Sequence, residues 1–458
     1  MKFGGTCTSS GSNIIRIVDI VKSHVEKGDK VVLVISAMAG VTDTLLTLID
    51  KALKGDEDEI NKRLLDLKNK HIQACIEAVT DEKLRNLTVG ELENTLNELT
   101  SMLKIISYLK EVSPRSRDRV LAFGEKLAAR IVWRALLSRG VKAEYLTGGQ
   151  AGIITDDNFG QAKPIMPLCE ERIRSTLLPL IDKGIVPVVT GFIGQTVDGV
   201  ETTLGRGGSD YTATIIGAAL EFDEVWVWKD VEGIMTADPK IIPNAKPIPR
   251  MSYDEATELA YFGAKVLHPQ ALNPLIEKGI PLRVRSFFNL ESPGTLVHHA
   301  NEANGQIVKA VSMIPHVAII TVSGAGLYEA PMIIAKVFSV LFNVGATAIM
   351  VSQSSSQTNI SFVVTNDKLE DILRKLREEL PENCDITWEE DVCVIAVVGS
   401  GMRGRPGVAA KVFNAVAEKG VNVRMIAQGA SELNISLVVK ESDAIKAVQA
   451  IHNAFIGA

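Results

Sequence analysis

A tandem repeat in the last third of the chain constrains its fold most. Residues 324–338 align without gaps onto residues 399–413, and residues 353–364 align onto 428–439 at the same offset. Each copy reads as strand, glycine turn, helix, strand, strand, helix, which is typical of the split βαβ pattern. Two copies indicate a tandem duplication, because a stacked array would need more repeats. We therefore expect two ferredoxin-like βαββαβ domains, at residues 307–390 and 391–458.

The two copies differ in how they obtain their sixth strand. The first copy can end with a strand at 385–388, whereas the second reaches Ala458 without one. The apolar stretch at 307–313, just upstream of the first copy, is a spare strand. We predict that this stretch fills the vacant place in the second copy.

Residues 1–300 have a different pattern. Residues 30–38 form a continuous apolar run bounded by turn residues, which is typical of a parallel strand buried on both faces. Further strands are predicted, in alternation with helices, at 141–147, 184–194, 224–231 and 280–287. This order predicts an α/β domain, an αβα sandwich with a mostly parallel sheet. The charged, glycine-poor segment 43–112 is expected to be a helical hairpin inserted into it.

The composition excludes several classes of function. The formal net charge of −6 gives no basic footprint, so nucleic acid is not an expected partner. Five cysteines lack CxxC spacing, which indicates free thiols in a reducing cytoplasm and no metal site. No run of 18 apolar residues occurs, so no membrane span is expected.

The stretch 202–220 is the strongest candidate for chemistry. It reads as a strand end, a glycine turn and a helix start, and a helix N-terminus attracts phosphate or carboxylate. The turn contains Gly205, Gly207 and Gly208, which can adopt positive φ, and Ser209 and Asp210 are candidate N-caps. Two further loops, at 2–5 and 229–240, carry candidate anion contacts. None of the three is a Walker A loop or a dinucleotide fingerprint.

Four motifs in order carry a resemblance to a known family. They are KFGG at 2–5, FGE at 123–125, TTLGRGGSD at 202–210 and FGAKVLHP at 262–269. Together they resemble the signature set of aspartate kinases, members of the amino-acid kinase superfamily, whose paired C-terminal ACT domains the tandem repeat also resembles. The resemblance implies phosphoryl transfer from ATP to L-aspartate, giving ADP and 4-phospho-L-aspartate. It further implies the first step of lysine, threonine and methionine biosynthesis, under feedback control.

The resemblance also assigns residues. Lys2 would neutralise the transferring phosphoryl group, and Asp210 would orient Lys2. Arg206 would grip a substrate carboxylate, Glu125 would face the substrate ammonium, and Thr42 and Ser209 would supply hydroxyl contacts. The residues expected to contact ATP are Lys2, Gly4, Gly5, Lys229, Asp230, Met235, Lys240 and Lys265. Mg2+ is expected to arrive bound to ATP, with no protein metal site.

The repeats are expected to bind an amino-acid effector and to form a homodimer, with a tetramer as the larger alternative. The expected effector contacts are Gly324, Gln353, Asn359, Gln428 and Asn434. L-threonine is favoured because it needs only a hydroxyl partner, whereas L-lysine needs a carboxylate for its ammonium group. Glu329 and Glu432 are the evident carboxylates for that purpose.

Two rival functions remain open at this point. One is an amino-acid kinase that acts on glutamate or N-acetylglutamate. Arg206 together with Glu125 favours a substrate with a free amino group instead. The other is an amino-acid sensor with an inactive kinase domain, which an intact set of Lys2, Arg206 and Asp210 disfavours.

Overall fold

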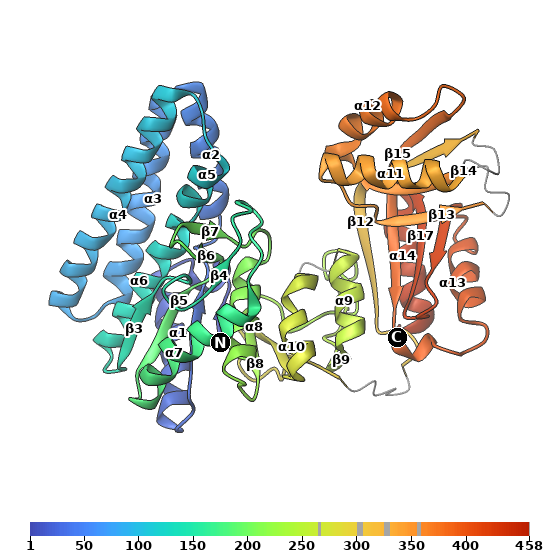
Figure 1. The fold of residues 1–458 in the computed structure, drawn as a ribbon. Helices are drawn as coiled ribbons and strands as arrows, with labels where there is room; N and C mark the ends of the chain where they lie inside the picture. Colours follow the sequence, from blue (N-terminus) through green and yellow to red (C-terminus); the bar gives the residue numbers. More distant parts are fainter. Residues whose placement is uncertain (264–266, 300–305, 325–329, 355–358, 458) are drawn as a thin grey trace. The chain divides into compact units, whose positions relative to one another are not determined.

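The computed structural model describes residues 1–263, 267–299, 306–324, 330–354 and 359–457. The chain forms two compact units. The first comprises Met1–Gly233 and Val266–His299, and the second comprises Ile234–Lys265 and Ala300–Ala458. The division differs from the predicted domain at 1–300 in one segment, 234–265, which packs with the C-terminal repeats. Figure 1 traces both units in sequence colours.

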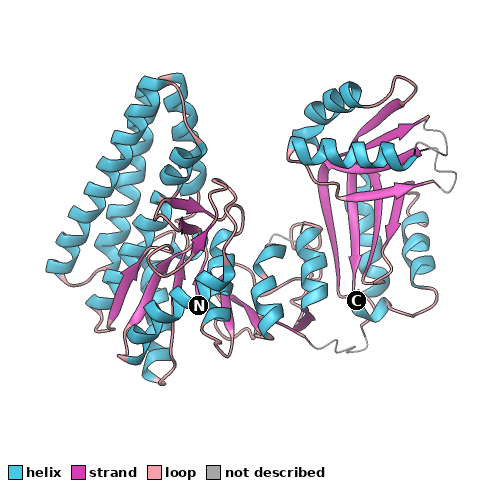
Figure 2. Ribbon diagram, in the orientation of Figure 1, coloured by secondary structure: helices cyan, strands magenta, loops and turns pink. Residues whose placement is uncertain are grey.

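The first unit is built around one main sheet (Figure 2). Its strands run in the order β3-β5-β2-β1-β8-β10-β11, parallel except for β11. The short β1 lies in the middle, between β2 and β8. These strands are β1 (Lys2–Phe3), β2 (Leu33–Ile35), β3 (Ala143–Leu146), β5 (Val186–Thr190), β8 (Val225–Lys229), β10 (Leu282–Ser286) and β11 (Thr295–His298).

Helices pack on this sheet in two groups, which confirms the predicted αβα sandwich. α1 packs against α6, and α7 packs against α8, which in turn contacts α10. A small sheet of β4 (Ile154–Thr155), β6 (Ile193–Thr196) and β7 (Glu201–Thr203) lies beside the main one. The helices are α1 (Gly11–Glu26), α5 (Pro114–Leu121), α6 (Phe123–Ser138), α7 (Met166–Asp182), α8 (Gly208–Ala219) and α10 (Asn273–Lys278).

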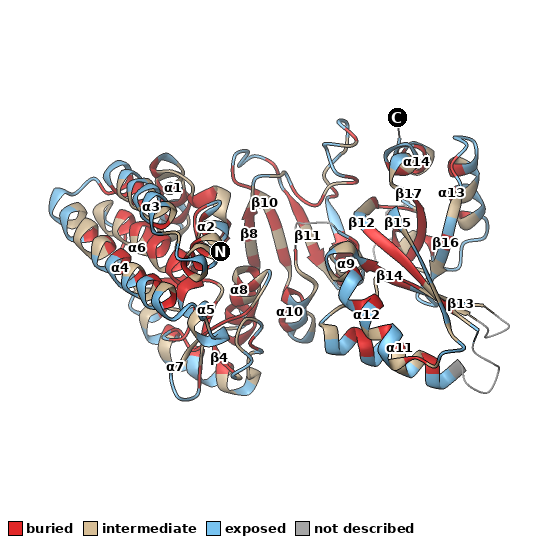
Figure 3. Ribbon diagram, turned by 90° about the horizontal axis from the view of Figure 1, so that it is seen from above, coloured by how far each residue is buried: buried red, intermediate tan, exposed pale blue. Residues whose placement is uncertain are grey.

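Three sequence predictions need correction here. The predicted strand at 184–194 is two strands, β5 and β6, that belong to different sheets. The apolar run 30–38 forms ladder bonds only over β2, although β2 is buried throughout as expected. The segment 43–112 contains three helices, not two: α2 (Val41–Lys54), α3 (Glu57–Ala78) and α4 (Glu82–Leu109). Their inner faces join the core of the unit and their outer faces are exposed (Figure 3).

The second unit is built around one six-stranded antiparallel sheet, ordered β13-β14-β12-β15-β17-β16. Each copy of the repeat contributes two helices to it. Its elements are β9 (Arg250–Ser252), α9 (Tyr253–Tyr261), β12 (Ala310–Ser323), α11 (Ala330–Val344), β13 (Met350–Gln353), β14 (Asn359–Thr365), α12 (Leu369–Glu379), β15 (Asp385–Val398), α13 (Val408–Ala417), β16 (Val423–Gln428), β17 (Asn434–Lys440) and α14 (Glu441–Phe455). Short 3₁₀ helices occur in both units. The first unit contains η1 (Gly5–Thr8) and η2 (Pro269–Ala271), and the second contains η3 (Asn366–Lys368) and η4 (Ser400–Met402).

The two copies exchange strands through β12 and β15. The first part of β12 pairs with the last part of β15, and Ala310 lies opposite Val398. Beyond a bulge in β12, its second part pairs with the start of β15, and Ser323 lies opposite Asp385. Residues 310–313 therefore complete the second copy, and residues 385–388 complete the first. This confirms the prediction that the spare strand completes the second copy. Part of the stretch 307–313 therefore belongs to the second copy and not to the first domain, where its bounds had placed it.

The segment 234–265 is fixed to the second copy by buried polar contacts. Glu255 of α9 is fully buried and pairs with Lys309 at 2.8 Å. Its other oxygen, Oε1, accepts from the backbone N–H of Ser400 at 2.7 Å. Thr236 lies 3.0 Å from Nε2 of His452. Burying these groups is favourable only because they are paired, so the segment packs as part of this unit.

Candidate active site

Three charged side chains meet beside two central strands of the main sheet. Lys2 lies on β1, and Lys229 ends β8, which pairs with β1 in parallel. Asp210, in the first turn of α8, bridges them. Its Oδ1 is 2.6 Å from Nζ of Lys2, and its Oδ2 is 3.1 Å from Nζ of Lys229. The structure thus brings together the two residues predicted to be catalytic, with Lys229 as a second cation.

In this triad of Lys2, Asp210 and Lys229, Lys2 and Asp210 are buried and Lys229 is half-buried. With both lysines protonated the triad carries one excess positive charge, although burial lowers the pKa of Lys2. The side chains of Lys2 and Asp210 are only 6% and 7% exposed. Burial disfavours the carboxylate, but the charges of both lysines outweigh this and lower the pKa of Asp210 to about 2. One carboxylate therefore faces two ammonium groups. Such a cluster is complete only when an anion joins it.

The glycines around the triad allow the backbone to come close. A Cβ on Gly5 would lie 3.0 Å from the carbonyl oxygen of Ala37. Gly207 has φ of 75° and a Cβ there would lie 2.4 Å from Cβ of His268. Gly207 is also the N-cap of α8, so the predicted caps at Ser209 and Asp210 are wrong. The left-handed Gly207 starts the helix at Gly208, which places Ser209 and Asp210 inside the first turn.

Glu125 lies close to the triad, at the start of α6. It is 4% exposed, and its Oε1 accepts from the backbone N–H of Ala37 at 3.1 Å. Its Oε2 has no hydrogen-bond partner among the described residues. Burial raises the pKa of Glu125 to about 8, although the Ala37 N–H and the charge of Lys2 oppose that rise. A buried, half-satisfied carboxyl group of this kind can receive a cationic ligand group.

The other predicted substrate residues lie on nearby loops and helix starts. Arg206 is exposed between Gly205 and Gly207, which both have positive φ. Within the described residues Arg206 has no ion-pair partner, so its guanidinium is available. Ser209 is half-buried in the first turn of α8, and Thr42 is half-buried in the first turn of α2.

The predicted nucleotide contacts divide between the two units. Lys229 belongs to the triad, and Asp230 follows it at an exposed position. Met235 and Lys240 belong to the segment that packs with the second unit. Lys265 lies outside the described residues. The chain therefore passes from the triad into the second unit within five residues, Lys229 to Ile234.

The strand register gathers the predicted effector residues of the first copy. Asn359 lies opposite Ser323, which precedes Gly324, and Gln353 pairs with Ile360, the residue after Asn359. Asp385 lies on the other side of Ser323. Directly paired residues share a face of the sheet, so Asn359, Ser323 and Asp385 form one row. Glu329 lies outside the described residues.

The second copy has the same register, and some of its polar groups are already engaged, although Oδ1 of Asn434 has no hydrogen-bond partner among the described residues. Asn434 lies opposite Val398, next to the Gly399 turn, and Gln428 pairs with Ile435. Asn434 is only 9% exposed, and its amide contributes to holding down the pKa of Glu258 on α9, which burial raises. In the loop between β16 and β17 the carboxylate of Glu432 accepts from the N–H of Gly404.

Sequence reasoning assigned no role to several residues that shape these sites. Phe192 has φ of 69° and packs against Gly208, and a Cβ on Gly191 would lie 2.7 Å from Cβ of Ser209. Both lie in the segment GFIG, whose flanking glycines were the available signal. Asp118 and Asp385 come together with their partners only through the fold, and no local pattern marks them.

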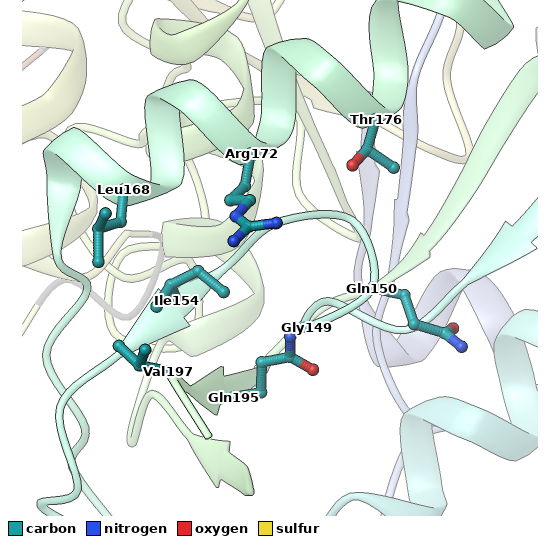
Figure 4. A pocket seen from close by; sticks show the side chains of 9 residues that line it. Gly149, Gln150, Ile154, Leu168, Arg172, Thr176, Gln195 and Val197 are labelled. Carbon is teal, nitrogen blue, oxygen red and sulfur yellow. The ribbon is translucent and has the colours of Figure 1, made fainter. Parts of the chain in front are cut away.

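A separate cavity lies in the first unit away from the triad. Its volume is about 330 Å³, and Leu168, Arg172 and Thr176 line it from α7, with Gln195 on β6 beneath them (Figure 4). None of the predicted site residues lines it. Among the described residues there is no group of three or more His, Cys, Asp or Glu side chains that could hold a metal ion. Nor does any described helix have the length and apolar character needed to cross a membrane.

Comparison with known proteins identifies the family. Residues 1–286 match the amino acid kinase family, and residues 320–380 and 395–455 match the ACT domain. Aspartokinase 1 of Arabidopsis thaliana, a chloroplastic protein, is 34% identical over 99% of this chain and 79% of its own length. A bifunctional aspartokinase/homoserine dehydrogenase of Zea mays is 32% identical over 99% of this chain, which spans only 50% of that relative.

Solved structures agree with the sequence relatives. Aspartokinase III of Escherichia coli in complex with aspartate and ADP superposes with a TM-score of 0.87 at 30% identity, over 99% of this chain and 98% of that one. The same enzyme in complex with lysine and aspartate gives a TM-score of 0.77 over the same shares. The triad, the glycine loops and the paired ACT domains thus occur in a chain that belongs to the aspartokinase family.

Proposed function

We propose that this chain catalyses the aspartate kinase reaction, the transfer of the γ-phosphoryl group of ATP to the β-carboxylate of L-aspartate. The observation that carries the proposal is the Lys2–Asp210–Lys229 triad, with its buried Lys2–Asp210 pair and its excess positive charge, set beside two glycine loops. Phosphoryl transfer to a carboxylate brings two anions together. Catalysis then depends on fixed positive charge and on positioning.

The acceptor needs no general base. A free carboxylate with an unperturbed pKa of about 3.9 is already ionised at neutral pH. Lys2 stabilises the transferring phosphoryl group, and Asp210 holds Lys2 in position at 2.6 Å. Arg206 binds the α-carboxylate of the substrate with its planar fork. Glu125 receives the α-ammonium group and releases its proton as that group binds.

The nucleotide side uses the second cation and the loop after it. Lys229 contacts the phosphates from β8, and the backbone at Gly4 and Gly5 approaches them where no Cβ intervenes. The N–H of Gly4 itself donates to the carbonyl of Trp228 at 3.4 Å, so the N–H of Gly5 is the proposed donor. Both oxygens of Asp210 are engaged by lysines, so Asp210 is not free to serve as a metal ligand. Mg2+ accordingly enters with ATP, held by phosphate oxygens and water, and offsets phosphate charge.

The first ACT copy is the proposed effector site. Its row of Asn359, Ser323 and Asp385 combines amide, hydroxyl and carboxylate groups beside the Gly324 turn. L-threonine, favoured from sequence, would use the neutral groups. L-lysine is the alternative, because Asp385 could pair with its ammonium group and because the E. coli relative is known in complex with lysine.

We further propose a homodimer formed through the ACT domains. Three large apolar side chains on α11 are exposed: Met332 (43%), Phe338 (45%) and Phe342 (84%). An apolar surface of this kind marks a contact site in a soluble protein. Phe342→Glu should shift the sedimentation of the full chain toward the monomer, whereas an unchanged dimer would exclude α11 as the contact.

The five free cysteines favour a reducing compartment such as the cytoplasm, although the plant relatives are chloroplastic.

Hydroxylamine trapping of the acyl phosphate tests the proposed reaction. The full chain should form hydroxamate with ATP, Mg2+ and L-aspartate. L-glutamate and N-acetylglutamate should give little or none. Repeating the assay with L-threonine or L-lysine, on the native chain and on Asp385→Asn, identifies the effector. Loss of lysine inhibition alone in Asp385→Asn would assign lysine to the first copy, and preference for either glutamate substrate would refute the proposed activity.

A further inference from the structure

Helix α5 carries a buried carboxylate, Asp118, that lies outside the proposed site. Asp118 is completely buried and accepts three hydrogen bonds from two segments, the loop at Gly160 and the end of β7 at Thr203. Its Oδ2 accepts from the backbone N–H of Gly160 at 3.0 Å and of Thr203 at 2.8 Å. Its Oδ1 accepts from Oγ1 of Thr203 at 2.8 Å. Within the described residues it forms no ion pair, so these three donors are what stabilises it there.

The residues that Asp118 holds lie at the base of the substrate loop. Thr203 ends β7, and Arg206 follows three residues later. The loop at Gly160 lies against the same segment: Ala162 donates to the carbonyl of Thr203 at 3.0 Å, and a Cβ on Gly205 would lie 3.2 Å from the carbonyl oxygen of Gly160. The carboxylate of Asp118 thus holds both backbone segments, at Thr203 and at Gly160, that lie against each other where the chain enters Gly205.

The triad does not share this support. Asp210 is held by Lys2 on β1 and by Lys229 on β8, and neither contact involves a residue of α5 or β7. Arg206, in contrast, is exposed and has no ion-pair partner in the described part of the chain. Its position is set by the backbone on either side of it. The backbone before it is anchored at Thr203, and the backbone after it enters α8 through Gly207.

We propose that Asp118 is a positioning residue for substrate recognition: by binding the backbone of Thr203 and Gly160, it holds the loop that presents Arg206 to the carboxylate of L-aspartate. This inference rests on the proposed function of Arg206. It assigns Asp118 a geometric role in which its charge is not required. An asparagine could make the same three contacts, with Oδ1 accepting both N–H groups and Nδ2 donating to Oγ1 of Thr203.

Three substitutions separate geometry from charge and from general stability. Asp118→Asn keeps the contacts and removes the charge, Asp118→Leu removes both at similar size, and Thr203→Val removes only the hydroxyl contact. A loop displaced by about 1 Å can lower the rate by roughly 10²-fold. We expect Asp118→Leu to raise the KM for L-aspartate strongly while the KM for ATP stays near the native value. Thr203→Val should show a smaller increase in the same constant, and Asp118→Asn should behave like the native chain.

Steady-state kinetics of the full chain test the proposed function and the role of Asp118 separately. Formation of hydroxamate from L-aspartate by the native chain tests the proposed function alone. The ratio of variant to native KM values then tests Asp118. A selective rise in the KM for L-aspartate, with recovery in Asp118→Asn, supports the proposal. Equal losses for both substrates, or an Asp118→Asn variant as impaired as Asp118→Leu, would overturn it. If Asp118→Leu fails to fold, an unchanged KM for L-aspartate in Thr203→Val overturns it as well.

Discussion

Two buried clusters of charge, one in each unit, differ in whether their charges balance. In the first unit Asp210 faces both Lys2 and Lys229, at 2.6 and 3.1 Å. In the second unit Glu255 faces Lys309 alone, at 2.8 Å. Further hydrogen bonds complete that pair. Glu255 accepts from the N–H groups of Ser252 and Ser400, and Lys309 also donates to a backbone carbonyl.

The difference indicates what each cluster is for. A neutral pair with its hydrogen bonds satisfied needs nothing further, so the Glu255 pair is expected to fix structure. A cluster with an unbalanced positive charge favours an anion close by, so the Asp210 cluster is expected to bind one. Burial alone would have placed both clusters in the same class. The numbers of charges and of hydrogen-bond donors distinguish the Asp210 cluster from the Glu255 pair.

The largest effect on stability is expected from the balanced pair. Glu255→Gln leaves the Lys309 ammonium group buried without a counter-charge, which should lower the free energy of unfolding by about 3–5 kcal/mol. The matched control is Glu221→Gln, whose side chain is 59% exposed and pairs with Arg174 at the surface. Exposed pairs contribute about 0–1 kcal/mol. Urea unfolding of the full chain should separate the two variants, and equal midpoints would contradict the structural role of Glu255.

A smaller effect, confined to one substrate, is expected at Arg206. Arg206→Lys replaces a planar fork by a point charge, and a hydrogen bond to a charged group contributes about 1.5–3 kcal/mol. The KM for L-aspartate should rise by roughly 10- to 100-fold, since about 1.4 kcal/mol corresponds to a factor of ten, while the KM for ATP changes little. Arg172→Lys is the control, because Arg172 lines the separate cavity on α7. A rise in the KM for ATP instead would mean that Arg206 binds phosphate.

A pH dependence set by Glu125 is also expected. Its pKa is raised to about 8, so the folded chain holds a proton that the unfolded chain releases near pH 4.5. The free energy of unfolding should therefore fall as pH rises from about 4.5 to 8. Over the upper part of that range the KM for L-aspartate should fall, because the ionised carboxylate binds the substrate ammonium group.

Glu125→Gln provides the matched comparison for this pH dependence. The substitution should flatten the contribution of Glu125 to both profiles and raise the KM for L-aspartate at pH 8. A native chain whose KM for L-aspartate is constant between pH 6.5 and 8.5 would show that Glu125 does not contact the ammonium group.

The sequence was sufficient where function depends on local motifs. KFGG and TTLGRGGSD place Lys2, Asp210 and five glycines within short stretches, so their use in one site could be proposed before the fold was known. The tandem repeat likewise predicted the ACT pair and the use of the strand at 307–313. These features are determined by spacing along the chain, and spacing is directly readable.

Contacts between distant segments could not be predicted in the same way. Asp118 meets Thr203, and Glu255 meets Lys309 and Ser400, across long sequence separations. The placement of 234–265 with the second unit depends on such contacts, which spacing along the chain does not reveal. Helix starts were also misjudged. Ser209 and Asp210 are good capping residues, but the left-handed Gly207 before them starts α8 first.

The comparison of the two clusters is tested most directly by making one substitution in each. Lys2→Met and Lys309→Met remove a buried lysine of the same kind from the unbalanced and the balanced cluster. Lys2→Met should lower hydroxamate formation by about 10²–10³-fold, the loss typical of one preorganised charged or hydrogen-bonding group in a transition state. Its stability should change little, because Asp210 and Lys229 remain as a neutral pair. Lys309→Met should lower the unfolding free energy by about 3–5 kcal/mol and leave the turnover of the folded enzyme near the native value. A folded Lys2→Met chain with native turnover would show that the unbalanced cluster is not needed for phosphoryl transfer.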